Sequence, residues 1–447
     1  MPKHKPLLRT KEKVGKKGKP EGPTTANEYL AAGVDFEEAG EKWRAGDAAK
    51  SMRFFIRAIE TYGAGLQTFP QSFDLAYNNN TAQVLTSIAD IHAEGSTPSE
   101  SHRDEALSLL REALELFQRC LTVQEFKFTQ AQKDFTHGAD LVSEANETDT
   151  GDTSRAVSNA SEEELWASVE ELITKDTLLD TTIAQLDTLT AISSLGSIEN
   201  HNDVAWIEEY YRDTLQSKVL AYSDESSHQH EAALAKSKLV SAISDAAFRS
   251  GRLDIPTYEH EMNTAFHELD LTDDSQGLCD RADAYLSFSA SIQLSIGQAQ
   301  PNEIAALSIM GWKYITKALD SLTTASKLPD AQNLPRIHLR RGDCELLRLR
   351  LSQEPFNYDL AIKSAPTLLK NAEVYFRGSA KLAKSEDAGE EQFEAGTKEA
   401  VAAVLRGDTT QLSSLVKHHR EQVEAVLEDM RDDGLLGEES MREIVNL

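Results

Sequence analysis

The side chains best suited to acid–base or metal chemistry in this sequence are a few histidines with carboxylates beside them. His260 and His267 lie seven residues apart, each followed directly by a glutamate, Glu261 and Glu268. Residues seven apart can share one helix face, and imidazole and carboxylate groups are zinc ligands. Two helical turns are nevertheless a long separation for one ion, and the His-Glu-x-x-His pattern of zinc peptidases is missing. If the chain had an enzymatic or cofactor site, we would expect it here. The prediction, however, is that the protein is not an enzyme and needs neither metal nor cofactor.

Other patterns that carry chemistry are missing from the sequence. No Gly-x-Ser-x-Gly nucleophile motif occurs, and the glycines at 15 and 18 lack the strand and helix that a phosphate-binding loop requires. The three cysteines, Cys120, Cys279 and Cys344, are far apart. This spacing supports neither a disulfide framework nor a multi-cysteine zinc site.

Two groups of carboxylates remain as candidates for binding a partner. The first consists of Glu386, Asp387, Glu390 and Glu391, with Glu394 close behind, and the second of Glu428, Asp429, Asp432 and Asp433. Such groups can hold a Lys/Arg-rich protein by long-range attraction and charge-assisted hydrogen bonds. The alternative is that each group is simply a solvated face, and the sequence leaves both interpretations open.

Charge is distributed unevenly along the 447 residues, which hold 46 lysines and arginines against 74 acidic residues, a net charge of -28. The first 20 residues contain eight bases, among them Lys11, Lys13, Lys16, Lys17 and Lys19, and a single acid. We predict a disordered basic tail over residues 1–26, acting either as a nuclear-import signal or as a solvated tail without a receptor. Residues 21–447 carry about -35. This charge disfavours direct nucleic-acid binding by the folded body and would steer a basic protein toward it.

The rest of the chain has the pattern of a helical protein. Apolar residues recur three and four apart on faces predicted over Ala106–Phe117 and over Ile304, Leu307, Ile309, Trp312, Ile315 and Leu319. Short polar breaks such as Ser223–His228, Leu271–Gly277 and Leu328–Pro335 favour antiparallel neighbouring helices. No apolar run approaches the length of a membrane span and no signal peptide is evident, so we expect no membrane association and a location in cytoplasm and nucleus.

Composition shifts predict six segments. These are the basic tail 1–26, helical hairpins over 27–143, an acidic flexible loop over 144–160, a helical-repeat body over 161–384, a weak linker or helix over 385–408, and C-terminal capping or docking helices over 409–447. In the last segment Leu412, Val416, His419, Val423, Val426 and Met430 follow heptad spacing. This seam predicts either a helix that caps the array or one that docks onto another subunit.

One stretch, Val34–Ile59, is more specific than the others. Ala39 precedes Gly46-Asp47 by seven residues, and Ser51, Phe55 and Ala58 follow. We expect Gly46 to end one helix and Asp47 to cap the next. The small residues Ala39, Ser51 and Ala58 would let the two helices approach, with Trp43, Phe55 and Ile59 filling the space between them. The stretch resembles a tetratricopeptide repeat, although Ser51 stands where alanine is usual and a proline is expected earlier than Pro70.

The resemblance implies an all-α fold of antiparallel hairpins stacked in a right-handed superhelical array, closed by a C-terminal capping helix. It also implies a protein-binding scaffold without catalytic residues. Combined with the acidic body and the basic tail, it favours an escort or chaperone of a Lys/Arg-rich nuclear or ribosomal client. The alternative is a structural subunit or adaptor of a larger complex that docks through residues 409–447.

Overall fold

The computed structural model of the chain is built from helices. It describes residues 22–44, 48–72, 75, 80–93, 100–145, 173–196, 201–295, 301–386 and 388–445. Within these ranges no strand occurs. The predicted all-α fold is therefore confirmed, and the basic tail, with Lys11, Lys13, Lys16, Lys17 and Lys19, lies outside the described residues together with nearly all of the predicted acidic loop.

The helices follow one another along the chain with short connections. The first half contains α1 (Ala26–Arg44), α2 (Ala48–Thr68), α4 (Asn80–Ala93), α5 (Glu100–Ala145), α6 (Lys175–Leu195), α7 (His201–Tyr210), the π-helical turn η1 (Tyr211–Leu215) and α8 (Gln216–Ser223). The second half contains α9 (Gln229–Arg249), α10 (Ile255–Ala265), α11 (Ser275–Leu294), α12 (Pro301–Ala325), α13 (Leu334–Arg350), α14 (Asp359–Ser385), α15 (Gly389–Leu405), α16 (Thr410–Asp432) and α17 (Glu438–Val445).

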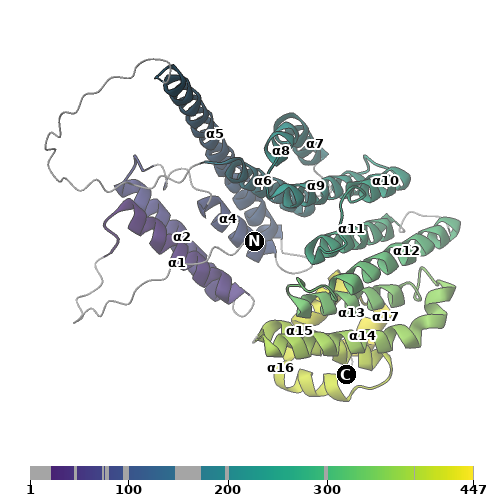
Figure 1. Cartoon of the computed structure of the whole chain (residues 1–447). Helices are drawn as coiled ribbons and strands as arrows, with labels where there is room; N and C mark the ends of the chain where they lie inside the picture. The colour runs from purple at the N-terminus through teal and green to yellow at the C-terminus, as the bar shows by residue number, and fades with distance from the viewer. Residues whose placement is uncertain are drawn as a thin grey trace.

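Each helix packs on its neighbours in the sequence, which produces an elongated, curved array (Figure 1). The pairs α1–α2, α4–α5, α11–α12 and α13–α14 are helical hairpins, and α6 pairs with α9 across the shorter helices between them. Capping side chains fix where helices begin. Asp254 and Asp274 each accept a backbone N–H three residues ahead, at 2.9 Å, at the starts of α10 and α11. The array is thus a succession of stacked helix pairs, as predicted.

The first hairpin depends on two glycines that let aromatic rings reach the opposite backbone. A Cβ added at Gly40 would lie 2.6 Å from Cε1 of Phe55, and one at Gly33 would lie 2.1 Å from Cε1 of Tyr62. The buried hydroxyl of Ser51 donates to the carbonyl oxygen of Gly40 at 2.8 Å. Because any side chain at positions 33 and 40 would occupy the space of a ring, glycine is required there for the close approach.

This arrangement corrects two expectations for the hairpin. Ala39 is only half-buried, and Gly40 is the residue at the close contact. Trp43 does not fill the space between the helices, because it lies at the end of α1 with 36% of its surface exposed and the ammonium of Lys50 over its ring. Phe55, Ala58 and Ser51 are buried as expected. Gly46 and Asp47 lie outside the described residues.

The same contact recurs near the other end of the array, between α13 and α14. A Cβ at Gly342 would lie 2.4 Å from Cε1 of Phe376, and the buried Ser379 donates to the carbonyl oxygen of Pro335 at 2.8 Å. A small residue, a ring and a hydroxyl bonded to the facing backbone therefore form a repeated packing unit.

The two predicted apolar faces differ in accuracy. In α5, Ala106, Leu110, Leu114 and Phe117 are buried, so that face is confirmed. In α12, Leu307, Ile315 and Leu319 are buried, whereas Ile309 is 56% exposed. Position 309 lies about 100° around the helix from the edge of the buried stripe and therefore faces solvent. Ser308 and Gly311 are buried on the stripe itself.

The C-terminal helices close the array. Leu412, Val423, Val426 and Met430 of α16 lie in a core shared with α13, α14 and α15. At His419 the backbone leaves helical geometry (φ -141°, ψ 43°), and His419 is exposed. The heptad-spaced seam is therefore turned inward along most of its length, which fits a capping helix. The segment 385–408 is largely occupied by α15.

Candidate protein-binding surface

Charged side chains form a continuous series across α6, α9, α11, α13 and α15, which we call the ionic ladder. It begins on α6 and α9, where the ammonium of Lys238 lies 2.8 Å from Oδ1 of Asp187. Asp280 and Asp283 of α11 come next and act on Lys238 through space. The ladder therefore continues from the α6–α9 pair to α11 through this electrostatic attraction.

The next contact joins α11 to α13, where the guanidinium of Arg340 pairs with Asp283. Asp343, one turn further along α13, accepts a hydrogen bond from Lys398 of α15 at 3.1 Å. Only 3% of the Lys398 side chain and 8% of the Asp343 side chain are exposed. A buried pair of this kind costs desolvation energy and is kept only while both partners are present.

Two further contacts complete the ladder on α15. Lys398 also lies 3.0 Å from Glu394, one helical turn earlier, and Glu394 lies 3.8 Å from Arg336 of α13. The full set has six carboxylates and four cations. The carboxylates are Asp187, Asp280, Asp283, Asp343, Glu391 and Glu394, and the cations are Lys238, Arg336, Arg340 and Lys398.

Two carboxylates of the ladder have a pKa that burial raises. Burial raises the pKa of Asp280, and Asp283 and Asp187 raise it further, against the lowering effects of Lys238 and a hydrogen bond from Gln276. Burial likewise raises the pKa of Glu391, with Glu394 and Glu386 adding to the effect and Arg336 opposing it. An added cation would lower both pKa values, because it would stabilise the charged forms. Both side chains are half-buried and so keep part of their surface in contact with solvent.

The ladder is buried where α13 meets α15 and open on both sides of that contact. Asp343 and Lys398 are covered, but 54% of the Asp283 side chain and 45% of the Asp187 side chain are exposed. Glu394 keeps 29% of its side-chain surface exposed. The accessible members from α6 to α11, and Glu391 and Glu394 on α15, can therefore meet a partner without the array unfolding.

Of the predicted acidic residues, two belong to the ladder, Glu391 and Glu394. Glu391 lies in the first turn of α15, Glu390 is exposed beside it, and Glu386 follows the end of α14. Asp387 lies outside the described residues. The second group, Glu428, Asp429, Asp432 and Asp433, lies exposed at the C-terminal end of α16, where Arg431 pairs with Asp432 at 2.9 Å. The structure brings Glu391 and Glu394 of the first group to the ladder and leaves the second group apart from it.

The histidine group predicted as the place for an enzymatic site is dispersed. His260 and His267 are exposed, and α10 ends at Ala265 before His267 and Glu268 are reached. Glu261 turns to another helix, where it accepts a hydrogen bond from Ser244 at 2.6 Å. Among the described residues, no group of three or more histidine, cysteine or acidic side chains is placed to hold a metal ion.

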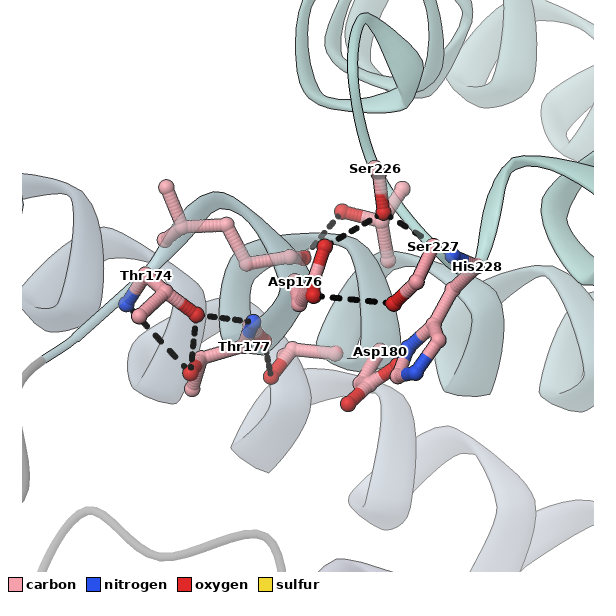
Figure 2. Close-up of polar contacts among 10 residues, drawn as sticks. Thr174, Asp176, Thr177, Asp180, Ser226, Ser227 and His228 are labelled. Carbon is pink, nitrogen blue, oxygen red and sulfur yellow. Dashed lines mark hydrogen bonds and ion pairs between the residues drawn. The ribbon is translucent and has the colours of Figure 1, made fainter. Parts of the chain in front are cut away.

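A second polar cluster holds the α8–α9 connection against the first turn of α6 (Figure 2). Thr174 caps α6 by accepting the backbone N–H of Thr177 at 3.2 Å. Asp176 accepts hydrogen bonds from Ser226 at 2.6 Å and from Ser227 at 3.0 Å. Asp180, one turn further, pairs with Nδ1 of His228. We call these residues the α6 clasp.

The α6 clasp contains serine, histidine and aspartate but lacks the order of a catalytic triad. Both serine hydroxyls donate to Asp176, and neither is hydrogen-bonded to the imidazole, so no base is placed to activate a nucleophile. Burial alone would lower the pKa of His228, but Asp180, Glu231 and Asp176 raise it above its ordinary value. The charged imidazolium is thus favoured, and the cluster acts as a structural contact between α6 and the α8–α9 connection.

Sequence reasoning missed most of the ladder because its contacts join residues far apart in the chain. Asp283 and Arg340 are 57 residues apart, and Asp343 and Lys398 are 55. A signal was nevertheless present, since charged residues recur three or four apart at Asp280 and Asp283, at Arg336 and Arg340, and at Glu394 and Lys398. Such spacing places each pair on one face of its helix.

Comparisons with known proteins add little to this description. No family model matches the chain. A stretch of 110 residues is 30% identical to a UPF0656 protein of Schizosaccharomyces pombe, and it covers 25% of this chain and 23% of that protein. The chain therefore matches less than a quarter of its relative's length.

Among solved structures, a circular tandem repeat protein with novel repeat topology and enhanced subunit contact surfaces is similar at a TM-score of 0.28 and 13% sequence identity, over 92% of this chain and 85% of that one. The repeat character of the fold follows from the packing of the helix pairs themselves. No described helix is long and apolar enough to cross a membrane.

Proposed function

We propose that this protein is a non-enzymatic, tetratricopeptide-like scaffold that escorts a Lys/Arg-rich nuclear or ribosomal client, which it holds along the ionic ladder. The observation that carries the proposal is the excess of carboxylates over cations in the ladder, together with the exposure of several of them. The repeated glycine–aromatic contact between paired helices also supports a repeat scaffold, since close helix pairs are the unit from which such arrays are built.

The binding chemistry we propose uses the two half-buried carboxylates Asp280 and Glu391. A lysine or arginine of the client placed beside Asp280 or Glu391 would form a charge-assisted hydrogen bond with the carboxylate. Because the charged form binds and burial raises the pKa of both groups, affinity for a basic client should be lost as the pH falls through their pKa values. Attraction by the whole acidic body would bring the client to the ladder, and salt would weaken that attraction.

The test is a capture experiment with the intact protein. Immobilised protein should retain Lys/Arg-rich proteins from a low-salt lysate and release them as salt is added. The double variant Asp280→Asn/Glu391→Gln should lose about tenfold in affinity for the most enriched client, the loss of one or two charge-assisted contacts. The matched control is Glu428→Gln/Asp433→Asn, which removes two exposed carboxylates away from the ladder and should change affinity by less than about twofold.

Two outcomes would contradict the proposal. If the captured proteins included no basic ones, the client would not be a Lys/Arg-rich protein. An equal loss in the ladder variant and the control would show that only net charge matters and that the ladder is not the binding surface. Nuclear and cytoplasmic location is part of the proposal, and imaging of the intact protein and of a variant with Lys11, Lys13, Lys16, Lys17 and Lys19 changed to glutamine tests it.

A further inference from the structure

The outward face of α2 has the opposite charge to the ladder. Lys50, Arg53 and Arg57 lie at spacings of three and four with the ring of Phe54 among them, and we call these four residues the basic strip. They line a hollow of about 260 Å³. The guanidinium carbon of Arg57 lies 5.9 Å from the Phe54 ring centroid. Arg53 and Arg57 are exposed, and Phe54 and Lys50 are half-buried.

The strip lies along a flank of α2 beside α1, where the ammonium of Lys50 is over the Trp43 ring. The buried residues of α2, among them Phe55 and Tyr62, face α1 and α4, and Ile59 packs toward Ala82 and Phe117. At 100° per residue, Lys50, Arg53, Phe54 and Arg57 lie on the side of the helix opposite to Ile59. The pair α1–α2 forms the N-terminal end of the array (Figure 1), and the helices against which α2 packs are α1 and α4.

The charge of the strip is locally positive within a strongly negative body. Three cations lie along about 10 Å of helix, while residues 21–447 carry about -35. The acidic residues closest in sequence are Asp47, three residues before Lys50, and Glu60, three residues after Arg57, and no ion pair joins Arg53 or Arg57 to a described carboxylate. A Lys/Arg-rich client would be repelled from this surface, so the strip does not extend the ladder.

The shape and lining of the hollow favour one kind of ligand. Its wall consists of the Phe54 ring and the stems of three long cationic side chains, which can cover an apolar group while their charged ends remain in water. A long nucleic acid would carry its phosphates past these three cations and onto the acidic remainder of the molecule. A short acidic peptide avoids that repulsion, because its charges end where the strip ends.

We propose that the basic strip binds a short acidic protein segment whose carboxylates flank a single large apolar side chain. The apolar side chain enters the hollow over Phe54, and the carboxylates pair with Arg53, Arg57 and Lys50, the arginines through two-pronged hydrogen bonds. The protein thereby has two surfaces of opposite charge preference, the ladder for a basic client and the strip for an acidic partner.

The experiment is a fluorescence anisotropy titration of the full chain with a labelled peptide of glutamates around one central leucine. Binding should weaken at least tenfold in Arg53→Glu/Arg57→Glu, and severalfold in Phe54→Ala or when the leucine of the peptide is replaced by alanine. The matched control is Lys363→Glu/Lys370→Glu, which makes the same charge change at exposed positions of α14 and should leave binding within about twofold of the parent. Far-ultraviolet circular dichroism checks that each variant is folded.

Three results would overturn the inference. One is that the peptide does not bind the parent chain, and another is that both charge-reversal variants lose binding equally. The third is that single-stranded RNA of the same net charge competes as well as the peptide, which would assign the strip to nucleic acid instead. Because the ladder is unchanged in these variants, capture of a basic client tests the proposed function separately.

Discussion

The hairpins α1–α2 and α13–α14 share one packing contact and differ in where they place charge. In both, a ring on the second helix lies against a glycine on the first, Phe55 on Gly40 and Phe376 on Gly342. Beside this contact the first hairpin has an isolated carboxyl group, whereas the second has a buried ion pair shared with a third helix. The comparison teaches that steric complementarity defines the pair, while charge defines which further helices the pair can accept.

The isolated carboxyl group of the first hairpin is Glu37, which accepts a hydrogen bond from the hydroxyl of Tyr62. Burial raises the pKa of Glu37 to about 7, and the neighbouring carboxylates Glu41 and Glu38 add to that effect while the Tyr62 hydrogen bond opposes it. In the second hairpin Asp343 is also buried, but Lys398 of α15 provides a partner. The first pair joins α4 through a partly exposed ion pair, in which Arg44 lies 3.0 Å from Asp90, whereas the second pair joins α15 through a buried one.

The largest expected effect comes from breaking the buried pair. Lys398→Met should lower the free energy of unfolding by about 3–5 kcal/mol, because Asp343 would then be buried without its cation. The double variant Asp343→Leu/Lys398→Met should recover most of that loss, since both desolvation costs disappear. Chemical denaturation measures both values, with Lys363→Met at an exposed position of α14 as the control. A single variant as stable as the control would show that the pair does not join α15 to the hairpin.

A smaller effect, similar in the two hairpins, is expected at the glycines. Gly40→Ala and Gly342→Ala should each lower the free energy of unfolding by about 1–3 kcal/mol, because the new Cβ overlaps an aromatic ring. Gly396→Ala in α15 is the matched control, since nothing lies within 4 Å of a Cβ there. It should raise stability by about 0.5–1 kcal/mol through helix propensity. If either glycine variant matched the control, the two hairpins would not share the contact.

The smallest expected effect is a pH dependence of the free energy of unfolding that Glu37 gives to the first hairpin. Since the pKa of Glu37 is higher in the folded state than its ordinary 4.5, the folded state binds the proton more tightly. Glu37 therefore supports folding fully at pH values below 4.5, and this contribution is lost as the pH rises toward about 7. Glu37→Gln keeps a hydrogen-bond acceptor for Tyr62 but does not titrate. The variant should therefore lose less stability than the parent as the pH rises, by roughly 1–3 kcal/mol in the free energy of unfolding over this pH range.

Thermal unfolding of the parent and the Glu37→Gln variant across this pH range measures the difference. The matched control is Glu38→Gln, which removes an exposed carboxylate one residue away and should leave the slope almost unchanged. Parallel pH curves for the parent and the Glu37→Gln variant would contradict the assignment of the titrating group.

The sequence predicts those parts of the fold that depend on local periodicity. The buried face of α5 follows from the spacing of Ala106, Leu110, Ala113 and Phe117, because apolar residues three and four apart share a side of any helix. Ile309 shows the limit of that reasoning, since an apolar residue one position off the stripe is exposed although its chemistry is the same.

What the sequence could not supply were the contacts between helices. To identify Gly40 rather than its neighbour Ala39 as the contact residue, one must know where Phe55 lies opposite α1. Local spacing in the sequence does not determine that position. The ladder likewise depends on which helices become neighbours after folding. The acidic group around Glu391 could be named from sequence, but its connection to Asp283 through Arg340 and Asp343 could not.

The length of α5 has a consequence for the whole molecule. Its 46 residues extend for about 70 Å, whereas α4, its hairpin partner, has 14 residues and extends for about 21 Å. A compact globule of this chain length would have a radius of gyration of about 22 Å, equivalent to a sphere nearly 60 Å across. A single rod-like element therefore exceeds that diameter. The protein should sediment more slowly, and tumble more slowly in solution, than a sphere of equal mass.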